Sequence, residues 1–195
     1  MHEFVTRRSM LQLSMGLLSA LGHPPSALSR TFDAPPAFET VRSQFTMIEP
    51  VRKLSPVRLR KVDGTVGFLE ASSDAVTLIS IWATWCANCR EDLRSLAALN
   101  RRSRESLKVV TISTDKLDLE VIAHFVRELG VEDLLTFVDP LGDVAGPIPT
   151  HGNLSSALGM PITYLVRPDA TVAGYITGSA DWTSESATRL LQYYE

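Results

Sequence analysis

The 195-residue sequence contains very little cysteine: only Cys86 and Cys89, with two residues between them. Two cysteines exclude a scaffold held by several disulfides and any site that needs four thiolates, whether for zinc or for an iron–sulfur cluster. A chain of this length can also bury a core without cross-links or metal. The pair is therefore not needed to hold the domain together, and its purpose has to be sought in chemistry.

The sequence also lacks a strong excess of either charge. Lysine and arginine total 19 against 22 aspartates and glutamates, which gives a net charge of −3. A broad basic surface for nucleic acid is therefore not expected. Hydrophobic residues make up 45% and charged residues 21% of the chain, and this balance excludes a disordered or collagen-like protein.

The N-terminal apolar run, Met10–Leu21, is about 12 residues long, whereas a membrane span needs roughly 20. Arg7 and Arg8 precede it and Gly22 follows, so residues 1–29 have the layout of an export signal peptide, with cleavage favoured at 27–29 over 20–22. The string around the two arginines resembles a twin-arginine signal, although it could be an ordinary positive region. Export predicts a periplasmic location, and an uncleaved leader would act as a membrane anchor.

Residues 30–50 are marked by prolines and predict an arm, and residues 51–195 predict one domain. The hydrophobic pattern switches repeatedly between strand and helix periods. The predicted elements are a hairpin at 57–69, strands at 76–83, 108–114, 134–138, 163–167 and 171–177, and helices at 86–103, 119–129, 154–158 and 184–193. This order predicts an α/β fold in which helices sandwich a mixed sheet that is parallel in front and antiparallel at the back.

The cysteine pair lies where a buried strand gives way to a helix. A helix N-terminus stabilises a thiolate, so the pKa of Cys86 should fall below the free value of about 8.5. Cys89, one turn further on, can close a disulfide with it. A structural bridge is the first alternative, but a loop this short restrains the unfolded chain very little. Zinc is the second, but the four histidines form no zinc-finger spacing with the pair. Redox chemistry is favoured, with no metal and no cofactor beyond the disulfide.

Three segments resemble a known family. Trp82–Cys89 is similar to the active-site segment of thioredoxin-fold proteins, and Gly159–Tyr164 is similar to their cis-proline segment. Gly178–Trp182 resembles the tail of the TlpA-like branch, which with its ResA-like and CcmG-like relatives comprises exported thiol–disulfide oxidoreductases. The resemblance covers about residues 50–193. It implies a thioredoxin-like three-layer sandwich with an N-terminal hairpin extension and a central insert.

The resemblance also implies roles for individual residues. Cys86 would be the exposed nucleophile and Cys89 the buried resolving cysteine. Pro161 would be cis and lie opposite the disulfide, and the backbone of Met160 would pair with an incoming peptide as an added strand. Trp85 would cover the rim of the site. The plainer alternatives are a trans proline that starts a strand and a tryptophan that only packs.

The sequence departs from its relatives at two positions, Ser80 and Asn88, and agrees with one branch at a third, Asp92. Ser80 stands where thioredoxin has a buried acid, and Asp92 stands where ResA-like proteins carry one. Asp92 is therefore a candidate proton relay for Cys89; the alternative is a solvated aspartate, which is favourable in the first turns of a helix. Asn88 replaces the usual proline before the second cysteine, so no reduction potential can be transferred.

The predicted function is an exported thiol–disulfide oxidoreductase that reduces disulfides of specific partner proteins. The resemblance suggests partners in cytochrome c biogenesis or in copper-site assembly, and a membrane thiol–disulfide electron donor. The alternative is a Cu(I) chaperone that binds through the same two thiolates, with His151 as the only plausible third ligand, although a solvated loop histidine is the plainer interpretation. An interaction domain without redox activity would be expected to have lost one cysteine, and both are present.

Overall fold

The computed structural model describes residues 34–40, 44–103, 107–147 and 154–195. The predicted signal peptide with both cleavage sites, and His151, lie outside these ranges. No helix within them is long and apolar enough to cross a membrane.

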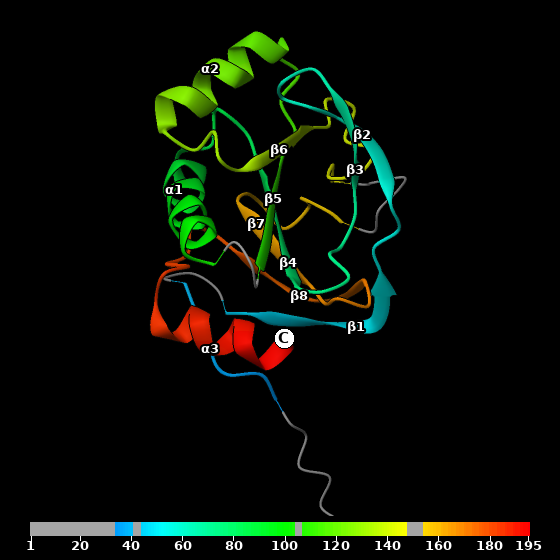
Figure 1. Ribbon diagram of the computed structural model, residues 1–195, viewed down its shortest axis with the longest axis vertical. Coiled ribbons are helices and arrows are strands. Elements are labelled where there is room, and N and C mark those ends of the chain that lie inside the picture. The colour runs from blue at the N-terminus through cyan, green and yellow to red at the C-terminus, as the bar shows by residue number, and fades with distance from the viewer. Residues whose placement is uncertain (1–33, 41–43, 104–106, 148–153) are drawn as a thin grey trace, which may run out of the picture. The chain divides into compact units, whose positions relative to one another are not determined.

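Within the described residues, eight strands form one sheet in the order β1-β8-β7-β4-β5-β6-β2-β3 (Figure 1). The strands are β1 Thr46–Lys53, β2 Val57–Lys61, β3 Val66–Leu69, β4 Val76–Trp82, β5 Leu107–Ser113, β6 Leu135–Val138, β7 Ile162–Val166 and β8 Thr171–Thr177. β4, β5 and β6 are parallel, whereas β7 pairs antiparallel with both β4 and β8. The β2–β3 hairpin joins the sheet through β6. The predicted mixed sheet with an N-terminal hairpin is confirmed.

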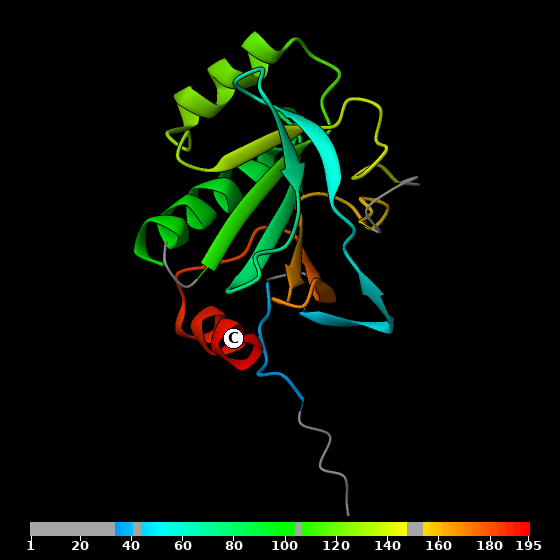
Figure 2. The ribbon, with the colours of Figure 1, turned by 45° about the vertical axis from the view of Figure 1, so that its right-hand side comes forward.

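Three helices in the described part of the chain pack on one face of this sheet: α1 Ala87–Arg102, α2 Leu119–Leu129 and α3 Glu185–Tyr194 (Figure 2). α2 ends at Gly130, whose left-handed conformation (φ 71°) forms its C-cap. α3 begins after Ser184, whose hydroxyl oxygen accepts the N–H of Ala187 and caps the helix.

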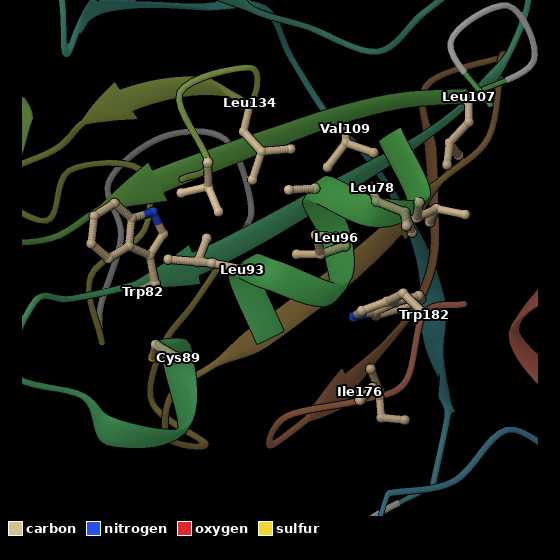
Figure 3. Close-up of a cluster of buried hydrophobic side chains, with 14 of the residues drawn as sticks. Leu78, Trp82, Cys89, Leu93, Leu96, Leu107, Val109, Leu134, Ile176 and Trp182 are labelled. Carbon is tan, nitrogen blue, oxygen red and sulfur yellow. The ribbon is translucent and has the colours of Figure 1, made fainter. Parts of the chain in front are cut away.

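The core beneath the helices has α1 at its centre. Leu93 and Leu96 of α1 are fully or almost fully buried and lie between Trp82 and Trp182 in Figure 3. Cys89 belongs to the same cluster. The helix that carries Cys89 is thus anchored in a buried apolar cluster, and this packing fixes the position of its N-terminus.

The other face of the sheet is covered by a second buried cluster. Ile79 and Ile81 of β4 point into it, because side chains alternate across a strand. Its outer side is formed by residues between or after strands, including Leu54, Val144, Ala145 and Leu154. Helices, sheet and this cover form three layers. The prediction that helices sandwich the sheet is wrong for the described residues, because all three helices pack on one face and loop residues cover the other.

Two segments differ from the predicted elements. β1 was not predicted: it is an edge strand that holds Pro50, is mostly exposed, and changes register between Met47 and Arg52, so it shows no alternating pattern. It also crosses the predicted boundary at residue 50. The predicted helix at 154–158 is wrong, because those residues have no regular secondary structure apart from a turn at 157–158. The hydroxyl of Tyr164 donates to the carbonyl of Ser155 (2.7 Å) and accepts its N–H (3.0 Å), which removes both groups from a helical ladder.

Candidate active site

The two cysteines lie where β4 passes into α1, as predicted. The Cys86 N–H donates to the carbonyl of Ala83 (3.1 Å), which turns the chain out of the sheet. Cys86 is the N-cap of α1, and its sulfur accepts the N–H of Cys89 at 3.2 Å. The two residues form a disulfide with their Cα atoms 5.3 Å apart. Cys86 is 8% exposed and Cys89 is fully buried, so an incoming reactant can approach only the first sulfur.

The predicted cis-proline segment lies at the same end of the sheet. The Met160–Pro161 bond is cis, as expected from the resemblance. Ile162, the next residue, pairs with Ile81 of β4, one residue before Trp82, where β4 ends. The carbonyl of Pro161 accepts the N–H of Gly178, so the chain is fixed on both sides. The register places the cysteine turn and the Met160–Pro161 segment side by side.

A groove of about 610 Å³ opens next to this pair of segments. Trp85, which is 72% exposed, and Met160 both line it. The remaining lining residues come from the ends of β5 and β6 and from the chain before β7: Thr114, Lys116, Pro140, Leu141, Gly142, Gly146, Pro147, Ser156, Ala157 and Gly159. The structure therefore places Trp85 and Met160 on one concave, largely apolar surface beside Cys86.

Asp92 is fully buried on the inner side of α1, so the alternative of a solvated aspartate is wrong. One carboxylate oxygen accepts the indole N–H of Trp182 (2.9 Å) and the N–H of Ala180 (3.2 Å). The other accepts the hydroxyls of Ser80 (3.1 Å) and Thr163 (3.4 Å). Burial raises the pKa of Asp92 from its ordinary value of 3.8 to about 6, although these hydrogen bonds oppose the rise.

These contacts give Ser80 a role that the sequence did not suggest. Ser80 in β4 occupies the position that holds a buried acid in thioredoxin. Its hydroxyl donates to the carboxylate of Asp92, which comes from α1. Trp182 and Ala180 belong to the tail that resembles the TlpA-like branch, and their hydrogen bonds to Asp92 explain why that tail lies against α1. The sequence of this tail indicated the family resemblance, but it did not indicate that the tail binds Asp92, about 90 residues earlier in the chain.

No group of three or more histidine, cysteine, aspartate or glutamate side chains in the described ranges is arranged to hold a metal ion. The candidate third copper ligand, His151, is not among the described residues. What the described geometry offers is a disulfide-bonded cysteine pair at a helix N-terminus, a buried acid and an adjacent groove.

Comparison with known proteins gives the fold a name. No protein-family model matches the chain. A DsbF homologue from Corynebacterium diphtheriae superposes with a TM-score of 0.59 at 15% identity, over 77% of this chain and 95% of that one. The fold is thioredoxin-like.

Two further solved structures agree. A thioredoxin-family thiol:disulfide interchange protein from Chlorobium tepidum TLS has a TM-score of 0.58 at 14% identity, over 75% of this chain and 98% of that one. An exposed lipoprotein thioredoxin from Streptococcus pneumoniae has a TM-score of 0.55 at 19% identity, over 72% and 98%. At these identities the likeness establishes the thioredoxin-like fold, and the chemistry has to be argued from the site itself.

Proposed function

We propose that this protein is a thiol–disulfide oxidoreductase that reduces disulfides of specific partner proteins through Cys86 and Cys89. The observation that carries the proposal is the position of Cys86: its sulfur caps α1 and accepts a backbone N–H, and the preceding residue, Trp85, lines the groove. A thiolate at a helix N-cap is stabilised by the helix dipole and by the amide. A purely structural bridge would gain nothing from that position.

In the reduced protein, the Cys86 thiolate attacks one sulfur of a target disulfide, and the second target sulfur leaves as a thiolate that takes up a proton. Cys89 then loses its proton and attacks the sulfur of Cys86. This step releases the first target sulfur as a thiol and re-forms the Cys86–Cys89 disulfide. Two electrons have passed to the target, and a dithiol donor must return two electrons for the next cycle. Disulfide exchange of this kind needs no cofactor beyond the cysteine pair.

We propose Asp92 as the acceptor of the Cys89 proton. It follows Cys89 by one helical turn, is buried on the same helix, and has a pKa near 6, which suits a group that must take and return a proton near neutral pH. Its hydrogen bonds go to Trp182, Ala180, Ser80 and Thr163. Because Cys89 is not among these partners in the disulfide form, transfer requires a bridging water or the opening of the disulfide.

The finer proposal is that the protein is exported and acts in the periplasm, with a membrane thiol–disulfide protein as its donor. The layout of residues 1–29 supports export. The family resemblance supports targets among the thiols of apocytochrome c or of copper-site assembly proteins. One of the similar structures is described as an exposed lipoprotein, which is compatible with function outside the cytoplasm.

The direct test is turnover of the purified protein with insulin as the disulfide substrate and dithiothreitol as the donor. We expect reduction by the wild type and none by Cys86→Ser or Cys89→Ser. Titration against glutathione should show a reversible two-electron couple. If the wild type neither reduces insulin nor shows that couple, the enzymatic proposal fails. Stoichiometric Cu(I) binding without exchange would instead favour the chaperone, and its loss in His151→Ala would identify the third ligand.

A further inference from the structure

Asp115, two residues beyond β5, is a buried carboxylate that the proposed exchange reaction does not use. It is 3% exposed. One oxygen accepts the backbone N–H of Thr84 (2.8 Å) and the hydroxyl of Ser113 (2.8 Å), and the other accepts the hydroxyl of Thr84 (2.9 Å). Burying a carboxylate is costly unless donors satisfy it. Two of its three donors come from one residue, Thr84, which precedes Trp85 and Cys86.

Thr84 needs this partner because the sheet ends beneath it. The last β4–β5 pair is Trp82 with Ser113, and the Thr114 N–H still donates to the carbonyl of Trp82 (3.0 Å). Beyond that point the chain leaves the sheet to begin α1. Among the described residues, no backbone carbonyl of β5 accepts the Thr84 N–H, and the Asp115 carboxylate accepts it instead. This side chain therefore extends the hydrogen bonding between β4 and β5 beyond the last backbone pair.

Thr114, the residue before Asp115, contacts Met160, and both residues line the groove. The hydroxyl of Thr114 lies 3.7 Å from the sulfur of Met160 and 3.4 Å from the carbonyl of Trp82. Thr114 and Lys116 also line the groove with Trp85 and Met160. The end of β5 therefore touches both the turn that carries Cys86 and the residue before Pro161.

We infer that Asp115 is a positioning residue that fixes Trp85 and Cys86 at a set spacing from Met160, so that a protein target is held in register with the nucleophile. This inference rests on the proposed disulfide exchange. Asp115 touches neither cysteine in any described contact, and it acts through Thr84. The contacts that favour a Cys86 thiolate belong to α1 itself, so they persist when Asp115 is changed. Positioning should therefore matter for large targets, which contact the groove, and little for small disulfides.

The test compares two substrates in single-turnover reactions of the reduced, full-length protein. In Asp115→Ala, the rate constant with insulin should fall about tenfold, because small displacements of reacting groups are costly. The rate constant with hydroxyethyl disulfide should change less than about twofold. Asp115→Asn should restore most of the insulin rate, because one amide can accept from the Thr84 N–H and donate to its hydroxyl.

Thr136→Val is the matched control, because it loses a buried hydrogen bond to Thr111 (2.9 Å) between β5 and β6 without touching the cysteine turn. It should leave the ratio of the two rate constants unchanged. If Asp115→Ala does not fold, Thr84→Val replaces it and should lower the same ratio about threefold.

A ratio that stays at the wild-type value in a folded Asp115→Ala or Thr84→Val protein would overturn the inference. The inference would also be overturned if Asp115→Asn lowered the insulin rate constant as much as Asp115→Ala does. That result would mean that the charge of Asp115 matters and its hydrogen bonds to Thr84 do not. Failure of the wild type to reduce insulin at all would instead refute the proposed function.

Discussion

Asp92 lies inside the helical core, and Asp115 lies at the end of β5 beside the Cys86 turn. Both are buried carboxylates that accept hydrogen bonds from residues distant in sequence. Asp92 joins α1 to β4, to β7 and to the segment before α3, through four donors. Asp115 joins only two neighbouring strand ends, through Thr84 and Ser113. One carboxylate thus holds the helix in the core, and the other holds the turn from which the helix starts.

The difference in surroundings separates two tasks. Asp92 is enclosed by apolar packing, and its raised pKa lets it exist in either protonation state near neutral pH. The contacts of Asp115 fix the position of the residues just before the nucleophile. We therefore expect changes around Asp92 to alter the dependence of stability on pH near 6, and changes around Asp115 to leave the Asp92 transition where it is.

The largest expected effect is on the pH dependence of stability. The folded-state pKa of Asp92 is near 6 against an ordinary 3.8, so the folded protein binds this proton more tightly than the unfolded chain does. The stabilisation is complete below about pH 3.8 and is lost as pH rises through 6, for a total of about 3 kcal/mol. Urea unfolding between pH 4 and 7.5 should show that loss in the wild type relative to Asp92→Asn. A constant difference between the two proteins over this range would contradict the assignment.

A smaller effect is expected from Trp182→Phe, which removes the indole N–H that donates to Asp92. Hydrogen bonds to charged groups contribute about 2 kcal/mol, so the free energy of unfolding should fall by about that amount at pH 7. The loss should be smaller at pH 4.5, where Asp92 is neutral, and the pKa of Asp92 should rise further.

A double-mutant cycle of Trp182→Phe with Asp92→Asn separates this bond from lost packing. The coupling energy should be largest at pH 7. No coupling at that pH would mean that Trp182 acts only as a core side chain.

The smallest effect is expected from Thr84→Val, which removes one hydroxyl bond to Asp115 and retains the backbone N–H bond. Stability should fall by about 1 kcal/mol at pH 7, with the Asp92 transition unmoved. Thr84→Ser keeps the hydroxyl and serves as the control. If the Asp92 transition near pH 6 shifted in Thr84→Val but not in Thr84→Ser, the two carboxylates would be coupled. That result would contradict the claim that Asp92 and Asp115 act independently.

Much of this architecture was predictable because it rests on local patterns. The continuous apolar run of β4 and the helical spacing of α1 placed the cysteine pair at a strand–helix junction, and the structure has it there. β1 escaped detection because an exposed edge strand with an internal proline carries no alternation. The short helix expected at 154–158 is absent because the Tyr164 hydroxyl takes up the backbone groups of Ser155.

The side-chain partners were the hardest part to predict. Asp92 could be suspected from its spacing after Cys89, but three of its four donors lie 71 to 90 residues away in the sequence. Asp115 gave no signal at all, since its role depends on β4 and β5 ending side by side, 31 residues apart in the chain. Spacing identifies a reactive pair, whereas the groups that hold that pair become visible only once the strands are paired.

The central claim is that Cys86 attacks and Cys89 resolves, and capture of a mixed disulfide tests it most directly. Each single-cysteine variant, Cys89→Ser and Cys86→Ser, would be reacted with a disulfide-containing peptide and its mass measured. Because Cys86 is partly accessible and Cys89 is fully buried, Cys89→Ser should retain one half of the peptide disulfide and Cys86→Ser should retain none. Equal capture by both variants, or capture by Cys86→Ser alone, would contradict this account.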